Sequence, residues 1–169
     1  AEWVLGSFHG DTNGLATWPV TEALLSLAPE GAHVLFGLDA NTHREAVPGK
    51  SYGAEEYAAA LEAAGARTAW PRGSEAAFLT TFTARTCLQA QVQKAVRFAD
   101  LKQSPLTDRH PKDHVVLRAN EGLEVVSCER DNTGEGRFEP DQMLPTTTFP
   151  SDHAAVRVTV RVTGKAAGG

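Results

Sequence analysis

The sequence has little cysteine, no long apolar run and no excess of basic charge, and each of these absences excludes a class of protein. Its two cysteines, Cys87 and Cys128, are too few for a disulfide framework or a thiolate zinc site, and we expect ordinary thiols. No apolar run approaches the roughly 18 residues that a membrane-spanning helix needs. The formal net charge of −5 argues against non-specific binding to a polyanion, which normally requires a basic surface. A local basic cleft stays open as an alternative, with candidates at Arg67, Arg72, Arg85, Lys94, Arg97 and Lys102.

The sequence contains enough apolar residues to form the core of one domain, since they make up 41% of its 169 residues. Short apolar or alternating runs predict strands, and apolar residues three and four apart predict helices. The predicted strands are 2–8, 32–38, 113–118, 123–128 and 154–162, and the predicted helices are 19–27 and a segment capped by Ser51 that ends at Ala64, before Gly65. The pattern is weaker between Pro71 and Pro111, where 78–82 is compatible with a strand and 89–99 with a loop or short helix. Helices alternate with strands early and strands dominate late, which predicts a layered α/β sandwich over residues 1–163 and a flexible tail at 164–169.

Polar side chains stand where the first two core strands are predicted to end. His9 follows the first strand, where it could protonate a leaving oxygen or bind a phosphate, or simply be satisfied by loop backbone. Asp39 and Asn41 follow the next strand, and a spacing of two on extended backbone places them on the same side. One can hold a nucleophilic water while the other donates to a developing oxyanion, although such residues also form ordinary turns.

Two more polar sites border the later strands. Asp113 opens a predicted strand, where its carboxylate could orient an imidazole or merely cap the strand. The adjacent Asp152 and His153 precede the last predicted strand. Such a pair can bind a divalent cation and move a proton at a reacting phosphate, or form a turn into the strand.

A zinc site is a weaker alternative. His110 and His114 are four residues apart, which is the spacing of a zinc-binding pair on one face of a helix. Pro111 and the strand-like sequence after it argue against that helix.

Taken together, His9, the Gly37-Leu38-Asp39-Ala40-Asn41 segment, Asp113 and Ser151-Asp152-His153 resemble, in this order, the motifs of the endonuclease/exonuclease/phosphatase superfamily, the fold of deoxyribonuclease I. The resemblance runs from about residue 3 to about residue 162, and the last motif is the most specific. It departs from the family pattern at Leu38, which interrupts the usual glycine-aspartate pair.

The resemblance implies a divalent-metal-dependent phosphoester hydrolase of the phosphodiesterase or nuclease type, with Mg²⁺ or Mn²⁺ as cofactor and a nucleic acid, a nucleotide or a phospholipid head group as substrate. Asp39 would orient or deprotonate the attacking water, and Asn41 would stabilise the transition-state oxygens. His153, held by Asp113, would act as base or phosphate clamp. Asp152 would contact the metal, and His9 would bind the phosphate or assist the leaving group.

The family pattern also includes an earlier segment that carries an asparagine and a metal-binding glutamate on two strands. Because Glu2 lies too close to the strand of His9 for that role, the sequence resembles the C-terminal portion of a DNase I-like domain without its N-terminal strands. We therefore expect an N-terminal segment or a second polypeptide to complete the fold. Two alternatives stay open: a non-catalytic member of the same fold that serves as a binding or structural subunit, and an unrelated α/β binding protein.

Overall fold

A computed structural model describes residues 2–74, 77–84, 107–119, 122–140 and 142–163. The predicted loop or helix at 89–99, the tail at 164–169, Cys87 and the basic candidates Arg85, Lys94, Arg97 and Lys102 lie outside these residues. Cys128, the other cysteine, is a half-buried free thiol.

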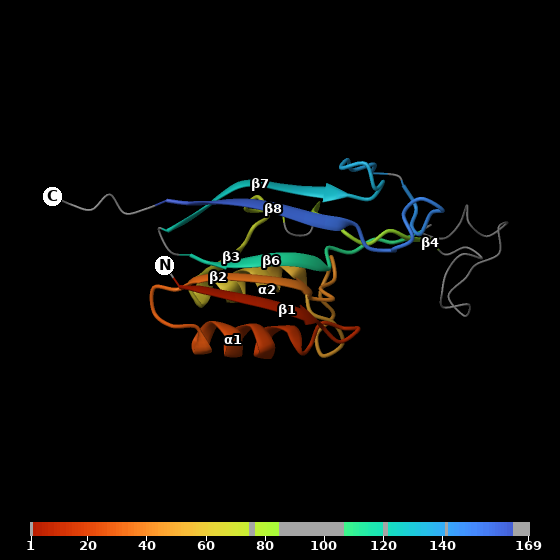
Figure 1. Cartoon of the computed structure of the whole chain (residues 1–169). Coiled ribbons are helices and arrows are strands. Elements are labelled where there is room, and N and C mark those ends of the chain that lie inside the picture. The colour runs from red at the N-terminus through yellow and green to blue at the C-terminus, as the bar shows by residue number, and fades with distance from the viewer. Residues whose placement is uncertain (1, 75–76, 85–106, 120–121, 141, 164–169) are drawn as a thin grey trace.

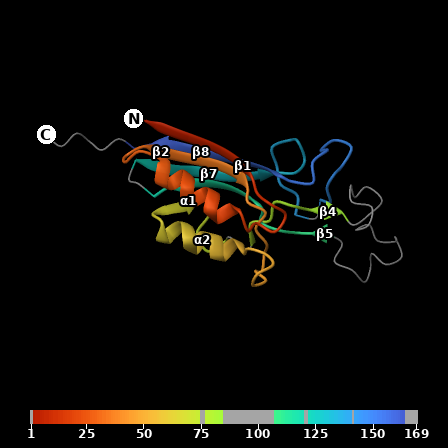
Figure 2. The same ribbon diagram turned by 90° about the horizontal axis from the view of Figure 1, so that it is seen from below.

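The described chain forms three layers (Figure 1), which confirms the predicted α/β sandwich. A four-stranded sheet in the order β1-β2-β6-β3 occupies the middle, and a β7-β8 hairpin covers one of its faces. Figure 2 shows α1 and α2 lying together on the other face, while the short β4-β5 pair lies beyond the end of the sheet. The elements are β1 Trp3–His9, α1 Thr17–Leu27, β2 His33–Asp39, α2 Ala54–Ala63, β3 Ala66–Thr68, β4 Thr83–Ala84, β5 Thr107–Asp108, β6 Asp113–Arg118, β7 Leu123–Asp131 and β8 Ala155–Val162.

Strand β2 shows why the layers form, because its side chains alternate between two cores. Phe36 and Leu38 point toward the helices and pack with Tyr57 of α2. Leu35 points the other way and packs against the hairpin. Burying one such side chain contributes roughly 1.5–3 kcal/mol, so both faces of the sheet add to stability. The one polar group of Tyr57 is also satisfied, since its hydroxyl lies 2.9 Å from the hydroxyl of Thr21 in α1.

The hairpin layer follows the predicted alternation of the last strand. Val158 and Val160 of β8 pack against Leu117 of β6, together with Leu123 and Val125 of β7. No helix in the described part of the chain is long and apolar enough to cross a bilayer.

Most predicted elements are found within one or two residues of their expected bounds, and two predictions are wrong. Helix α2 begins at Ala54 with Gly53 as its N-cap, because the Glu56 carboxylate accepts the Gly53 amide at 3.1 Å. Ser51, the predicted cap, instead pairs with Val47. The segment 78–82 forms no strand: apart from an isolated bridge between Thr81 and His153, its backbone bonds are divided among His110, Leu144 and the 152–154 segment, and β4 begins only at Thr83.

Gly6 of β1 provides a test of the helix-facing core. A Cβ at this position would lie 2.5 Å from Leu24 Cδ1 and 2.7 Å from Cδ2 of the buried Phe36 ring. We expect Gly6→Ala to lower the free energy of unfolding by about 1–3 kcal/mol, the usual cost of overpacking. The matched control is Gly37→Ala in β2, where a Cβ meets nothing within 4 Å and the change should be neutral or stabilise by up to about 1 kcal/mol. Urea unfolding of both variants measures the difference, and equal effects would contradict this account of the packing.

Candidate active site

Strand register places three polar side chains in one row at an end of the sheet. His9, the last residue of β1, is paired with Asp39, the last residue of β2. Asp39 is in turn paired with Asp113, the first residue of β6. Because β1 runs parallel to β2 and β6 runs antiparallel to it, two strand ends and one strand beginning meet at the same edge.

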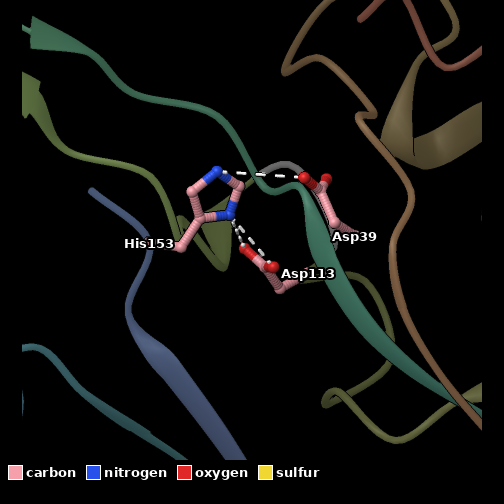
Figure 3. A group of neighbouring side chains, drawn as sticks. All are labelled: Asp39, Asp113 and His153. Atoms are coloured by element: carbon pink, nitrogen blue, oxygen red, sulfur yellow. Dashed lines mark hydrogen bonds and ion pairs between the residues drawn. The ribbon is translucent and has the colours of Figure 1, made fainter. Parts of the chain in front are cut away.

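His153 approaches this row from the hairpin layer, just before β8. Its Nδ1 lies 2.9 Å and 3.1 Å from the two carboxylate oxygens of Asp113. Because a carboxylate only accepts, Nδ1 carries a proton and donates it. Nε2, on the other side of the ring, lies 3.8 Å from Oδ2 of Asp39. Figure 3 shows the resulting arrangement, an imidazole between two carboxylates.

Thr80 holds the two layers together at this point. Its hydroxyl oxygen accepts the backbone N–H groups of Lys112 and Asp113, each at 3.0 Å. Its carbonyl accepts the N–H of Ala154 at 2.7 Å. One fully buried residue therefore fixes the backbone beside both Asp113 and His153. This explains why 78–82 forms no continuous strand, since its hydrogen bonds go to segments on either side.

Burial and neighbouring charges perturb the two groups that face each other. Burial and the charge of Asp113 raise the pKa of Asp39, although its hydrogen bond from the Asn41 amide and the nearby His153 and Lys112 act in the opposite sense. Burial lowers the pKa of His153, but the hydrogen bond to Asp113 and the charges of Asp113, Asp39 and Asp152 outweigh burial, so that this pKa is raised above 6.5. A carboxylate with a raised pKa beside an imidazole with a raised pKa is an arrangement suited to proton transfer.

Asn41 is held in the left-handed region, with a φ of 50° that asparagine tolerates better than most residues. Its Oδ1 accepts a 2.6 Å hydrogen bond from Lys112 Nζ, and its Nδ2 donates to the Gly10 carbonyl at 3.1 Å. Since an ammonium only donates, Lys112 fixes which way the amide points. Gly14 completes this corner, because a Cβ there would lie 2.8 Å from the carbonyl oxygen of Asn41.

The remaining predicted site residues lie at the rim. The side chain of His9 is 80% exposed, with Nε2 3.7 Å from Oδ2 of Asp39. Asp152 is exposed, and its charge acts on the neighbouring His153. The structure thus brings Asp39, Asp113 and His153 into one group and places His9, Asn41 and Asp152 beside it.

His110 and His114 do not converge on a common ion. His114 is buried in the core, where its ring stacks on Trp70 with centroids 4.1 Å apart, and burial lowers its pKa to about 4. Its Nε2 donates to the Pro111 carbonyl at 3.0 Å. His110 lies against the ring of His43 instead.

A divalent cation fits the central group. Asp39, Asp113 and His153 each offer one ligand atom, and these atoms lie within 4.8 Å of one another. A cation would relieve the repulsion that raises the pKa of Asp39, and carboxylate oxygens suit hard cations. Both oxygens of Asp113 already bond to His153, so Oδ2 of Asp39 is the most available ligand. Since the described residues bring at most three ligands together in this group, most positions around the ion would be left to water, phosphate oxygens or residues from elsewhere.

No family model matches the sequence, and no curated protein matches it. Among solved structures, the chain is similar to an endonuclease/exonuclease/phosphatase from Beutenbergia cavernae DSM 12333, with a TM-score of 0.48 and 16% identity over 92% of this chain and 34% of that one. It is also similar to a truncated TDP2 from Caenorhabditis elegans, with a TM-score of 0.47 and 15% identity over 95% of this chain and 54% of that one. The chain therefore spans between a third and just over half of these two proteins. Because both TM-scores are below 0.5, function has to be inferred from the geometry of the site.

Two residues of the site, Lys112 and Thr80, were missed by the sequence patterns. Lys112 directly precedes Asp113 in the sequence. Its position next to a carboxylate that opens a strand could have identified it as a residue of the site. Thr80 left no such signal, because its partners are more than 30 residues away in the sequence.

The coupling of His153 to Asp113 predicts a specific pH effect. The raised pKa of His153 in the folded state adds stability that is complete below pH 6.5 and is lost as the pH rises through the folded-state pKa. Asp113→Asn removes this contribution, so we expect a lower His153 pKa and a flatter dependence of unfolding free energy on pH above 6.5. Histidine-ring NMR titration measures the pKa, with His153→Gln to assign the resonance. Asp152→Asn is the control and should lower the pKa less, because Asp152 is exposed; an equal or larger effect would contradict the geometry.

Thr80 should be important for stability through its hydroxyl. Thr80→Val keeps the shape but leaves the N–H groups of Lys112 and Asp113 without their acceptor, and we expect a loss of about 1–3 kcal/mol in the free energy of unfolding. Thr80→Ser keeps the acceptor and should lose only about 1 kcal/mol for the missing methyl group. Denaturant unfolding compares the two, and equal losses would show that the hydroxyl is not what matters.

Proposed function

We propose that this chain carries the acid–base part of a divalent-metal-dependent phosphoester hydrolase of the phosphodiesterase or nuclease type. The observation that supports it most is the imidazole of His153 placed between the carboxylates of Asp113 and Asp39. An arrangement that served only the fold would not be expected to place two carboxylates together in a partly buried site, because they repel one another there.

The proposed mechanism starts from the gap between Asp39 and His153. At 3.8 Å, Nε2 and Oδ2 are too far apart for a direct hydrogen bond, and a water or phosphate oxygen between them could bond to both. Asp39 would orient the attacking water and take its proton, which its raised pKa favours. His153, whose pKa is raised by Asp113, would hold a phosphate oxygen when protonated.

Asn41 and His9 would act on the phosphate from the side of β1. The Asn41 amide has a second hydrogen beside the one donated to Gly10, and it can stabilise an oxygen that gains charge in the transition state. The exposed His9 can reach a phosphate or a leaving oxygen. Mg²⁺ or Mn²⁺ held through Asp152, which leaves Asp39 free to act as the base, would neutralise phosphate charge and polarise the bond to phosphorus.

We also propose that an N-terminal segment or a second polypeptide covers the outer face of β1 and adds a metal-binding glutamate. Among the described residues β1 pairs only with β2, and it exposes Trp3 by 40% and Leu5 by 73%. An edge strand with an uncovered apolar face is normally protected by another element. The substrate would be a phosphoester in a nucleic acid, a nucleotide or a phospholipid head group.

Hydrolysis of bis(4-nitrophenyl) phosphate by the complete protein with Mg²⁺ or Mn²⁺ tests this function. Loss of a proton-transfer group typically costs about 10²–10⁴-fold in rate, and we expect Asp39→Asn and His153→Gln each to lose activity in that range. Removal of the metal with EDTA should abolish hydrolysis. Glu124→Gln is the control, because Glu124 pairs with Arg161 on the exposed surface of the hairpin.

Two results would contradict the proposal. Unchanged rates in both variants would place the chemistry elsewhere. A complete protein that hydrolyses neither this diester nor any nucleic acid, nucleotide or phospholipid would favour the non-catalytic alternative, a binding or structural subunit.

A further inference from the structure

Lys112 lies against the candidate active site but has no part in the mechanism proposed above. Its backbone is held on both sides, because its N–H donates to the Thr80 hydroxyl oxygen at 3.0 Å and its carbonyl accepts the N–H of Ala40 at 2.7 Å. The residue is half-buried and directly precedes β6. The side chain of Lys112 therefore starts from a fixed point beside the residues that follow β2.

The ammonium of Lys112 binds a neutral amide, although Asp39 and Asp113 stand at the adjoining strand ends. Its Nζ donates to Oδ1 of Asn41 at 2.6 Å. In the described part of the chain, the ion pairs of the two carboxylates are made with histidines and not with Lys112. An ammonium gains more from an ionised acceptor than from a neutral one. Neutralisation of charge therefore does not explain why the ammonium is placed on the amide.

The amide of Asn41 is held at both of its polar atoms. Oδ1 accepts from Lys112, and Nδ2 donates to the Gly10 carbonyl at 3.1 Å, which leaves one N–H for another acceptor. The contact with Lys112 is partly buried, where a hydrogen bond is stronger than in water. The amide is thus fixed in one orientation.

The positive charge of Lys112 also changes the amide itself. The nitrogen lone pair of an amide is delocalised toward its oxygen, and a cation bound at that oxygen increases the delocalisation. The N–H groups consequently become better donors, as expected when hydrogen bonds in a chain polarise one another. Lys112 can therefore act at a distance, on whatever accepts the second N–H of Asn41.

We propose that Lys112 is a positioning residue of the hydrolase reaction and acts through the Asn41 amide. It fixes the orientation of that amide and strengthens its second N–H as a donor to the phosphate oxygen that gains charge in the transition state. This role rests on the proposed function, in which Asn41 contacts that oxygen. Lys112 itself bonds to Asn41 and not to the substrate.

Steady-state hydrolysis of bis(4-nitrophenyl) phosphate by the complete protein tests the role of the charge. Lys112→Met keeps the unbranched stem without the ammonium. We expect kcat to fall about tenfold and KM to change less than about twofold, because the interaction that is lost develops only in the transition state. Lys112→Arg keeps a cation and Lys112→Gln keeps a neutral donor, so kcat should be highest in Lys112→Arg, intermediate in Lys112→Gln and lowest in Lys112→Met.

The control is Lys50→Met, because Lys50 is an exposed lysine in the turn before α2. It should leave kcat and KM unchanged. Equal kcat values in the three Lys112 variants and the unmodified protein, or a change in KM alone, would overturn the proposal. If Lys112→Met does not fold, the polar Lys112→Gln takes its place in each comparison.

A double-mutant cycle shows whether Lys112 acts through Asn41. Asn41→Gly removes the amide and suits the φ of 50° at this position. In this background Lys112→Met should change kcat by less than about twofold, because the group that Lys112 orients and polarises is absent. A loss as large as in the unmodified background would mean that Lys112 acts on the substrate or the fold directly, which contradicts the proposal.

The side-chain NH2 resonances of Asn41 report on the same contact without hydrolysis. Asn41→Gly assigns these resonances by removing them. We expect Lys112→Met to move the proton signals to higher field and Lys50→Met to leave them in place, and unmoved signals in Lys112→Met would refute the polarisation. A complete protein that hydrolyses no phosphoester would instead contradict the proposed function, and with it this role, even where the NH2 signals move as expected.

Discussion

The register of β2 between its two neighbours is the constraint on which the candidate site depends. Asp39 pairs with His9 on one side and with Asp113 on the other, so one alignment of three strands creates the whole row. A slip of one residue in β2 would turn Asp39 toward the helices and bring Leu38 to the position between the two other polar groups. The apolar residues of β2 prevent that slip, because Val34, Phe36 and Leu38 are buried on the helix side only in the present alignment. The core of the protein therefore fixes the position of its most polar residues.

The register of the sheet cannot place His153, which belongs to the other layer. That coupling depends on the segment around Thr80, which bonds to the backbone of Lys112 and Asp113 on one side and to Ala154 on the other. Hydrogen bonds are short and directional, so they fix the separation of the two layers more sharply than apolar contacts do. A 2.9 Å contact between His153 and Asp113 needs that precision. Packing brings the layers together, and Thr80 sets the distance at which the imidazole and the carboxylate meet.

The sequence predicted what leaves a local or periodic signal. A short strand-like run located β6, alternation located β8, turn residues bounded β2, and polar residues at the ends of strands marked Asp39 and Asp113. It failed where the decisive contacts are long-range. The segment 78–82 resembles a strand in composition, but its backbone bonds are divided among several distant segments. One local signal was also misread: Ser51 has the chemistry of an N-cap, but Gly53 takes that position and its backbone N–H donates to the Glu56 carboxylate. The distance between His153 and Asp39 depends on 113 intervening residues, and no local pattern contains it.

Charge balance links the site to the cation that the proposed function requires. The carboxylates of Asp39 and Asp113 face the Lys112 ammonium and the His153 imidazole, whose pKa these carboxylates raise, so the protein itself already balances much of their charge. A phosphodiester brings one more negative charge into a partly buried region, where an uncompensated charge is costly. His9 lies beside Asp39, but its side chain is mostly exposed, so that its interaction with a phosphate is screened by solvent. A divalent cation supplies the missing charge at the phosphate itself. Metal dependence of the proposed reaction thus follows from the charges of the site as well as from the identity of its ligands.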